Sequence, residues 1–343
     1  MKIAIYGAGA MGTVLGAFLT EGGQPVDLIS RNEAHVAALK EKGATVRCLA
    51  DGVEKTVAVS ALLPEELTEK YDVIFLMTKQ RSNQEIVSFL QDYLTDDGIV
   101  CTTQNGLPEL SVAAVLGNDR TYGAAVSFGA NFVGGGVVEL TSSLAAMSVL
   151  CGGYQNGNEK NGLLEYILQR AGTVSGNPQF VTATGNLAGA RWAKLAVNSA
   201  FSTLSTITGL TFGQVAKGRK TKRLAVKLLR EAIAVAKASG VTLQPMQGHD
   251  MEKLFGGEGF FKTQLVYALL PYAMRKHKML VSGMLGDIAK GRKCDVDFVC
   301  GAVVAQGKAV GVETLVSEMA VEMVHAIENG LNEITPQNVD FML

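Results

Sequence analysis

Near its start the chain runs from a largely apolar stretch, residues 2–6 (KIAIY), directly into the turn Gly7-Ala8-Gly9-Ala10-Met11-Gly12. A G-x-G-x-x-G turn between a strand and a helix is the fingerprint of a dinucleotide-binding unit. Gly7 permits the tight turn, Gly9 lets backbone amides approach a pyrophosphate, and Gly12 lets helix and strand pack closely. The stretch predicts a Rossmann-type domain, with cofactor contacts at Gly7, Ala8, Gly9, Ala10, Met11 and Gly12.

The first half of the chain repeats this alternation of short apolar runs and amphipathic stretches. The pattern is typical of a parallel sheet covered by helices. Alternating residues at 45–48 and 55–59 predict a small antiparallel insertion, and three glycines at 134–136 with runs 137–141 and 146–151 predict a further hairpin. The predicted strands are 2–6, 25–30, 73–78, 99–103 and 122–128, and the predicted helices are 11–21, 33–42 and 82–93.

Strand-like runs end near residue 181, and long stretches with helical period follow. A glycine-rich break interrupts them at 255–260, and the tail carries Pro336 and little periodicity, which predicts an extension of uncertain order. The fold class is therefore an α/β N-terminal Rossmann-type dinucleotide-binding domain followed by an all-α C-terminal domain. The predicted domains are 1–183, 184–331 and a C-terminal extension 332–343, with helices at 186–206, 220–239, 299–310 and 314–329.

Composition excludes several classes of protein. The 343 residues carry 31 Lys+Arg against 32 Asp+Glu, so no net field attracts nucleic acid or an anionic membrane. The glycine turn comes before a signal-peptide core can form, and no apolar run reaches 18 residues, which predicts a cytoplasmic protein. Five scattered cysteines predict free thiols, and the four histidines show no metal-ligand spacing, so we expect no metal.

The choice of cofactor depends on Arg31. It follows the second predicted strand about twenty residues after the turn, where an NAD site usually places an acidic residue for the ribose 2′-hydroxyl. A guanidinium instead offers a charge-assisted pair of hydrogen bonds to a 2′-phosphate, which predicts NADPH/NADP+. Asp27 is the rival acidic residue, but it lies too early in the strand. A solvated surface arginine is the alternative interpretation of Arg31.

Further polar residues stand where strands of this sheet end. Lys79 and Asn105 each follow an apolar run, and the carboxyl ends of strands in an open α/β sheet face the ligand crevice. We expect both side chains to point toward cofactor or substrate. For Asn105 an ordinary Asn-Gly turn is the competing interpretation.

In the helical half, Lys194 and Asn198 are four residues apart and share one helix face. A lysine near a domain crevice can protonate an alkoxide as hydride arrives, provided that desolvation adjusts its pKa. An exposed helix lysine without a catalytic role is the alternative.

Taken together, these residues resemble the ketopantoate reductases (2-dehydropantoate 2-reductases) over nearly the whole chain. The resemblance rests on the glycine turn, Arg31, Lys79, Asn105-Gly106, the Lys194 to Asn198 helix, the segment Ser282 to Asp287, and Asp295-Val296-Asp297 with Gly301. It implies an oxidoreductase in which Lys194 is the general acid and Asn198 orients the substrate. It also implies that Lys79 and Asn105 lie beside both nicotinamide and substrate.

Three positions depart from the family pattern. Ser202 stands where a second asparagine is common, Gly283 where a serine meets the substrate carboxylate, and Asp295 where a longer acidic residue is usual. Ser282, adjacent to Gly283, is the expected substitute. We predict substrate contacts at Lys79, Asn105, Asn198, Ser202, Ser282 and Asp295. A lost hydroxyl or amide contact costs on the order of 1–3 kcal/mol of discrimination, so the resemblance implies the reaction type more strongly than the substrate.

The expected function is NADPH-dependent reduction of a 2-oxo acid, ketopantoate to pantoate, which supplies pantothenate and coenzyme A. Two alternatives stay open: a relative that reduces another 2-oxo acid or an imine, and a non-catalytic NADP(H)-binding sensor. The expected partner is a small-molecule 2-oxo acid, with no nucleic acid and no membrane. Apolar helical faces also allow a homodimer.

Overall fold

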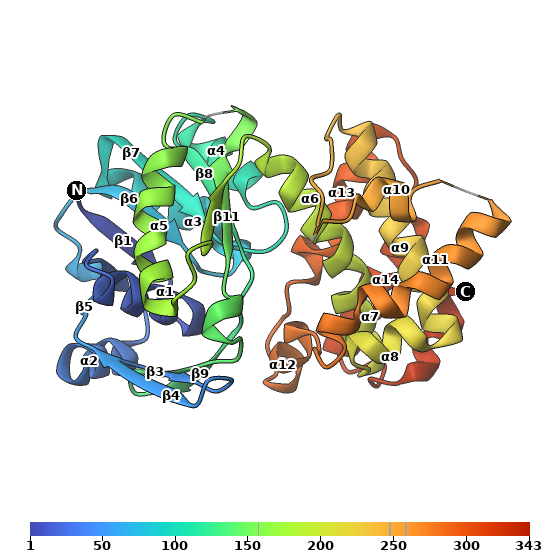
Figure 1. The fold of residues 1–343 in the computed structure, drawn as a ribbon, viewed down its shortest axis with the longest axis horizontal. Helices are drawn as coiled ribbons and strands as arrows, with labels where there is room; N and C mark the ends of the chain where they lie inside the picture. The colour runs from blue at the N-terminus through green and yellow to red at the C-terminus, as the bar shows by residue number, and fades with distance from the viewer. Residues whose placement is uncertain (157, 247, 258) are drawn as a thin grey trace. The chain divides into compact units, whose positions relative to one another are not determined.

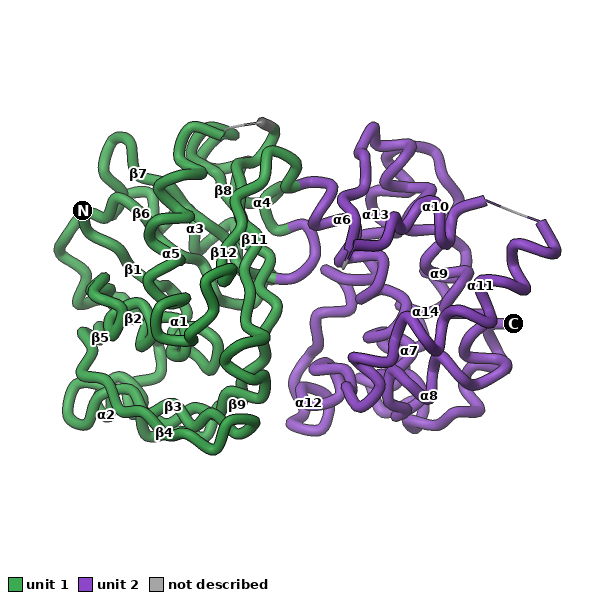
Figure 2. The backbone as a smooth tube through the Cα atoms, in the orientation of Figure 1, with its two compact units in different colours: residues 1–104, 108–187 green, residues 105–107, 188–343 purple. Residues whose placement is uncertain are grey.

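The computed structural model describes residues 1–343 except 157, 247 and 258, and the chain forms two compact units (Figure 2). Unit 1 comprises residues 1–104 and 108–187, and unit 2 comprises residues 105–107 and 188–343. Unit 1 is α/β and unit 2 is helical, as the sequence predicts. The first unit ends at residue 187 rather than 183, and three residues at 105–107 join the second unit early.

An eight-stranded sheet forms the centre of unit 1 (Figure 1), with strand order β12-β11-β8-β7-β6-β1-β2-β5. Strand β1 lies between β6 and β2 and pairs in parallel with both. Only β11 and β8 pair antiparallel among the described strands of this sheet. The strands are β1 (Ile3–Tyr6), β2 (Asp27–Ile29), β5 (Ser60–Leu62), β6 (Tyr71–Leu76), β7 (Leu94–Thr102), β8 (Thr121–Val126), β11 (Val149–Gly153) and β12 (Val181–Ala183).

Both faces of this sheet are buried, which explains the near-continuous apolar strands. In β1, Ile3 and Ile5 join the core cluster that includes α1 (Ala10–Glu21) and α5 (Asn161–Ser175). Ala4 and Tyr6 face the opposite cluster, which includes α3 (Asn83–Leu90) and α4 (Glu109–Leu116). The remaining helix of unit 1, α2, spans Glu33–Lys42 as predicted.

A second, four-stranded sheet with order β4-β3-β10-β9 corrects one prediction. The antiparallel pair β3–β4 is present as expected, but residues 137–141 and 146–151 do not form a hairpin. Val138 and Leu140 of β10 bury in the small sheet, whereas β11 joins the large one beside β8. A short 3-10 turn at Leu144–Ala146 separates them, so two successive apolar runs serve two different sheets. The small-sheet strands are β3 (Ala44–Cys48), β4 (Val53–Val57), β9 (Ala130–Gly134) and β10 (Val137–Leu140).

Unit 2 is a bundle of helices around one apolar core. Its longest helix, α9 (Arg219–Ala238), buries a continuous apolar stripe that includes Leu224, Leu228 and Ile233. No helix among the described residues is long and apolar enough to cross a bilayer. The other helices are α6 (Leu187–Val197), α7 (Thr203–Thr208), α8 (Phe212–Lys217), α10 (Met251–Phe255), α11 (Phe260–Ala273), α12 (Gly283–Ala289), α13 (Cys300–Val310) and α14 (Leu315–Glu328).

The C-terminal tail is part of this bundle, contrary to the prediction of a separate extension. Residues Pro336–Met342 form a 3-10 helix, and Val339 and Met342 are buried in the core of unit 2. Asn338 anchors the segment because its Nδ2 donates to Ile207 O at 3.2 Å and to Glu333 O at 2.8 Å. Short-range periodicity did not reveal this packing, because Val339 and Met342 are buried whereas the apolar Phe341 between them is exposed.

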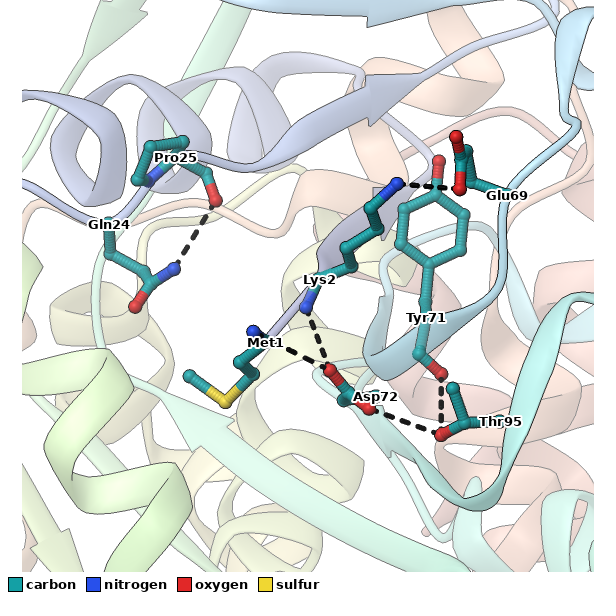
Figure 3. A network of polar contacts seen from close by, with 8 residues as sticks. All are labelled: Met1, Lys2, Gln24, Pro25, Glu69, Tyr71, Asp72 and Thr95. Atoms are coloured by element: carbon teal, nitrogen blue, oxygen red, sulfur yellow. Dashed lines mark hydrogen bonds and ion pairs between the residues drawn. The ribbon is translucent and has the colours of Figure 1, made fainter.

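Figure 3 shows the polar contacts that secure the amino-terminal ends of β1 and β6. Asp72 accepts a hydrogen bond from Lys2 N at 2.8 Å and one from Thr95 Oγ1 at 3.2 Å. Lys2 Nζ pairs with Glu69 at 2.6 Å. Lys2, Glu69 and Asp72 are thus paired within the unit, and a pocket of unit 1 lies at the opposite, carboxyl-terminal end of these strands.

Candidate active site

A pocket of about 390 Å³ lies at the carboxyl ends of β1, β2 and β6, entirely within unit 1. Its walls include the glycine turn after β1, residues 30–32 after β2 and residues 77–79 after β6. Gly7, Gly9, Arg31 and Lys79 are therefore brought together, although they are widely separated in the sequence. This is the crevice that an open α/β sheet offers to a ligand.

Two of the three glycines of the turn have a geometric reason to be glycine. Gly7 has φ +107°, and a Cβ there would lie 2.7 Å from the backbone of Met77 and Thr78. A Cβ at Gly12 would lie 2.6 Å from Gly7 O, whereas one at Gly9 would meet nothing within 4 Å. Gly7 and Gly12 thus close the turn, and Gly9 faces open space at the start of α1. Ala8 is buried beneath the turn, and Ala10 and Met11 are half-buried in the first turn of α1.

The amino terminus of α1 carries features that suit an anion. Its N-cap, Gly9, offers no side-chain acceptor, and the first turn contains no acidic residue. The backbone N–H groups at such an end and the helix dipole both favour negative charge. The pocket beside this helix end therefore has the features of an anion-binding site.

Arg31 is exposed at the rim of this pocket, two residues after β2. The chain turns there because Ser30 Oγ accepts from Asn32 N at 3.2 Å and Asn32 Oδ1 accepts from His35 N at 3.1 Å, which caps α2. The rival residue Asp27 lies at the start of β2, where its carboxylate accepts a hydrogen bond from Tyr71 Oη at 2.9 Å. Among the described residues, Ser30, Arg31 and Asn32 line this pocket directly after β2, and none of the three is acidic.

His35 packs beside the glycine turn, and the sequence analysis did not predict a function for it. Its Nε2 lies 3.1 Å from Thr13 Oγ1 on α1, and its Nδ1 accepts from Gly136 N at 3.3 Å. Because Nδ1 is an acceptor, the ring is neutral with its proton on Nε2. Burial lowers the pKa of His35, although a hydrogen bond with the Ala8 backbone opposes that shift.

In unit 2 the predicted proton donor lies on a long helical rod. Helix α6 runs into a π-helical turn, Asn198–Ser202, and then into α7. Lys194, Asn198, Ser202 and Thr206 recur at four-residue intervals, so they share one face of this rod. The sequence predicts a single helix over 186–206 and gives no signal for the π turn, a feature that is frequent at functional sites.

Lys194 is half-buried, and its surroundings lower its pKa to about 7. Desolvation by burial is the main cause, and the positive charge of buried Arg191, one turn earlier, adds to it. An amine that titrates near neutral pH exchanges protons readily in both directions, which is what a general acid or base requires.

The hydroxyl of Ser282 is directed into unit 2 rather than toward solvent. It lies 2.9 Å from Thr206 Oγ1, accepts from Met284 N at 3.2 Å to cap α12, and belongs to a buried residue. Ser282 N also donates to Ser205 Oγ at 3.0 Å. These contacts join the segment before α12 to the end of the polar face on the α6–α7 rod.

The other predicted substrate contacts lie at separate points of unit 2. Asn105 is exposed in the short segment 105–107 that follows β7. Asp295 is half-buried at the start of the 3-10 turn Val296–Phe298, and its neighbour Asp297 pairs with His325 at 2.8 Å. Gly283, at the family's serine position, is exposed in the first turn of α12.

Sequence reasoning missed a buried pair of amides behind Lys79. Gln104, which follows β7, and Asn83, which opens α3, bond to each other in both directions. The available signal was a glutamine directly after a buried strand, next to the predicted site residue Asn105. Gln104 is buried, whereas Asn105 is exposed.

Comparisons with known proteins agree with this arrangement. The family model described as ketopantoate reductase PanE/ApbA matches residues 3–149, and its C-terminal counterpart matches residues 186–328. A 2-dehydropantoate 2-reductase of Pyrococcus horikoshii is 26% identical over 332 residues, covering 96% of this chain and 98% of that protein. One of Lactococcus lactis is 25% identical and covers 96% and 98% respectively.

Solved structures show the same architecture. D-mandelate dehydrogenase in its complex with NADH and anilino(oxo)acetate has a TM-score of 0.80 and 25% identity, covering 97% of this chain and 100% of that one. The PanE/ApbA family ketopantoate reductase from Ralstonia eutropha has a TM-score of 0.77 and 25% identity, covering 96% and 99%. The two family models together span most of the chain and both of its units. The chain belongs to the ketopantoate reductase PanE/ApbA family of oxidoreductases.

Proposed function

We propose that the protein reduces 2-dehydropantoate (ketopantoate) to pantoate with NADPH. The observation that carries this proposal is Lys194, whose pKa of about 7 suits proton donation, on one helix face with Asn198. The family relationship supports the reaction type, because the curated relatives are named 2-dehydropantoate 2-reductases. The pocket of unit 1, with its glycine turn and two cations, supports a phosphorylated dinucleotide.

The residues of unit 1 fit such a cofactor. Gly9 leaves open space at the amino terminus of α1 for the pyrophosphate, and Arg31 offers a guanidinium for the 2′-phosphate. Lys79 on the same pocket adds a second positive charge that favours anionic groups. When bound, the reduced nicotinamide supplies the hydride for the oxo carbon of the substrate.

Lys194 provides the matching proton. As the oxo carbon accepts two electrons with the hydride, its oxygen becomes an alkoxide, and the Lys194 ammonium donates a proton to that oxygen. The product is the 2-hydroxy acid, and the neutral amine regains a proton from solvent. We assign substrate orientation to Asn198, Ser202, Asp295 and Asn105. Ser282 supports this set through Thr206, because its hydroxyl is already engaged inside unit 2.

A second candidate is reduction of another 2-oxo acid, and the likeness to D-mandelate dehydrogenase favours it. That protein was captured with NADH and an aryl-substituted oxo acid analogue, at a TM-score as high as that of the ketopantoate reductases. Gly283 and Asp295, which depart from the family pattern, are consistent with a changed acyl group. This candidate keeps the role of Lys194 and changes only the substrate.

The test is oxidation of NADPH by the purified protein with ketopantoate, phenylglyoxylate and 2-oxoisovalerate, each repeated with NADH. Ketopantoate with NADPH is expected to give the highest kcat/KM. A higher value with another oxo acid would establish the second candidate. Tight NADPH binding without turnover on any of these oxo acids would favour a cofactor-binding sensor, and a preference for NADH would refute the assignment of Arg31.

A further inference from the structure

The segment that carries Lys79 is closed by a buried amide network at its two ends. Gln104 Nε2 donates to Thr78 O at 2.8 Å and to Asn83 Oδ1 at 2.6 Å. In return Asn83 Nδ2 donates to Gln104 Oε1 at 2.9 Å. Thr78 precedes Lys79 and Asn83 follows it by four residues, so one glutamine side chain holds both ends of the segment.

Neighbouring residues fix the orientation of both amides. Gln104 Oε1 also accepts from Thr102 Oγ1, at the end of β7, at 2.8 Å. Asn83 Nδ2 also donates to Ser111 Oγ on α4 at 2.9 Å. Each amide therefore has its oxygen and its nitrogen committed in one direction, and neither can flip without losing hydrogen bonds. Both side chains are almost fully buried, so a lost bond is not replaced by bulk water.

The closed segment is also a wall of the cofactor pocket. Met77, Thr78, Lys79 and Ser82 all line it, and Lys79 itself is exposed. Between β6 and α3 the chain has only a single 3-10 turn at Gln80–Ser82. Such a turn has few internal hydrogen bonds, so its position depends on its ends. The position of Lys79 at the pocket therefore depends on Gln104 and Asn83.

We propose that Gln104 and Asn83 are positioning residues for cofactor binding, and that they act by holding the Lys79 segment against the pocket. This inference rests on the proposed function, because it takes the pocket of unit 1 to be the NADPH site. Neither residue lines the pocket. Their effect on the cofactor must therefore pass through the segment that they close.

The first test is the isosteric pair Gln104→Glu and Asn83→Asp. A glutamate at 104 keeps the acceptor but turns two donated bonds, to Thr78 O and Asn83 Oδ1, into repulsions. We expect the Kd for NADPH, measured by fluorescence titration, to rise about tenfold for Gln104→Glu. In steady-state kinetics the KM for NADPH should rise more than kcat falls.

Asn177→Asp is the matched control for loss of stability. Asn177 is another side-chain amide of unit 1, and its Nδ2 donates to Met147 O at 2.8 Å. Neither Asn177 nor Met147 lines the pocket. The control should lower the melting temperature of the protein while leaving the Kd for NADPH within twofold of wild type. An equal rise in Kd for the control and for Gln104→Glu would overturn the inference, because general destabilisation would then explain both.

A double-mutant cycle tests the route of the effect. If Gln104 acts through Lys79, then Gln104→Glu should weaken NADPH binding much less in a Lys79→Ala background than in wild type. Fully additive losses would contradict the proposed route even if each single variant binds poorly. Failure of the proposed function has a different signature: wild type itself would then bind neither NADPH nor NADH in the titration.

Discussion

The cofactor pocket of unit 1 and the polar face of unit 2 are built in opposite ways. The pocket is open and depends on the main chain: glycine geometry, a helix terminus and two exposed cations, Arg31 and Lys79. The polar face depends on side chains that are partly or fully buried, and burial shifts the pKa of Lys194 to about 7. Desolvation makes individual side chains matter more.

This difference predicts which single substitutions are costly in each region. Under the proposed function many groups of the pocket share the binding of one large ligand, so removal of one cation should weaken binding only in part. Under the proposed mechanism one amine of the polar face performs one chemical step, so its removal should stop that step. Expected effects therefore decrease from Lys194, through Arg31, to groups that only support either region.

Lys194→Met should produce the largest effect. The methionine preserves most of the volume but cannot donate a proton, so we expect kcat for oxo acid reduction to fall by about 10²–10⁴. NADPH binding, measured by fluorescence titration, should stay within twofold of wild type. The melting temperature at pH 6 should not fall, because burial disfavours the charged lysine. Turnover within tenfold of wild type would remove Lys194 from the mechanism.

The pH dependence of kcat/KM is a second test of Lys194 as the proton donor. Under the proposed mechanism the ammonium form is the proton donor, so kcat/KM for reduction should be constant below pH 7 and fall above it, by about tenfold per pH unit. Oxidation of the hydroxy acid needs the neutral amine, so its kcat/KM should rise with pH and level off above pH 7. Two profiles that move in the same direction would be incompatible with this assignment.

Arg31→Ala should weaken NADPH binding about 10–100-fold and leave NADH binding nearly unchanged, since a charge-assisted hydrogen bond contributes about 1.5–3 kcal/mol. The Kd of each cofactor is measured by titration at fixed ionic strength. Arg47→Ala is the matched control, because Arg47 is an exposed arginine of the same unit, paired with Glu54 on the small sheet. Equal losses for both cofactors would mean that Arg31 does not recognise the 2′-phosphate.

The two regions also differ in how far the sequence predicts them. The glycine turn and Arg31 are local features of strand and helix ends, and the spacing alone predicts the strand-turn-helix that the structure contains. Strands 2–6, 25–30 and 73–78 correspond to β1, β2 and β6, because strands buried on both faces are almost uninterrupted apolar runs.

What the sequence did not reveal depends on contacts between distant residues. The expected hairpin at 137–151 was wrong because β10 and β11 find partners in different sheets, a choice made by long-range packing. The π turn at Asn198–Ser202 has no periodicity signal over five residues. The Gln104–Asn83 pair joins residues 21 positions apart, and the Thr206–Ser282 pair joins residues 76 apart.

Thr206→Val tests whether the polar face needs its supporting hydroxyls. The variant removes the partner of Ser282 Oγ at 2.9 Å and should raise the KM for the oxo acid about 3–10-fold without changing the Kd for NADPH. Thr208→Val is the control, because Thr208 Oγ1 donates to Leu204 O at 2.6 Å and accepts from Leu210 N at 3.3 Å, and neither partner belongs to the Ser282 segment. If the control raises the KM as much, helix stability rather than Ser282 accounts for the result.

His35→Gln should give the smallest effect. His35 shares a feature with each region, because it is buried but belongs to the unit that contains the open pocket. Burial lowers its pKa from the ordinary value near 6.5, so the unfolded chain binds more protons below that pH. The free energy of unfolding should therefore decrease as pH falls below 6.5, by up to about 1.4 kcal/mol per pH unit, and be unaffected by this group above it. Urea denaturation of wild type and His35→Gln between pH 5 and 8 measures this, and the variant should lose that part of the slope. Parallel curves would show that other groups cause the acid sensitivity. Such a result for a buried residue of unit 1 would show that the burial of a group, and not the unit to which it belongs, determines how strongly the protein depends on that group.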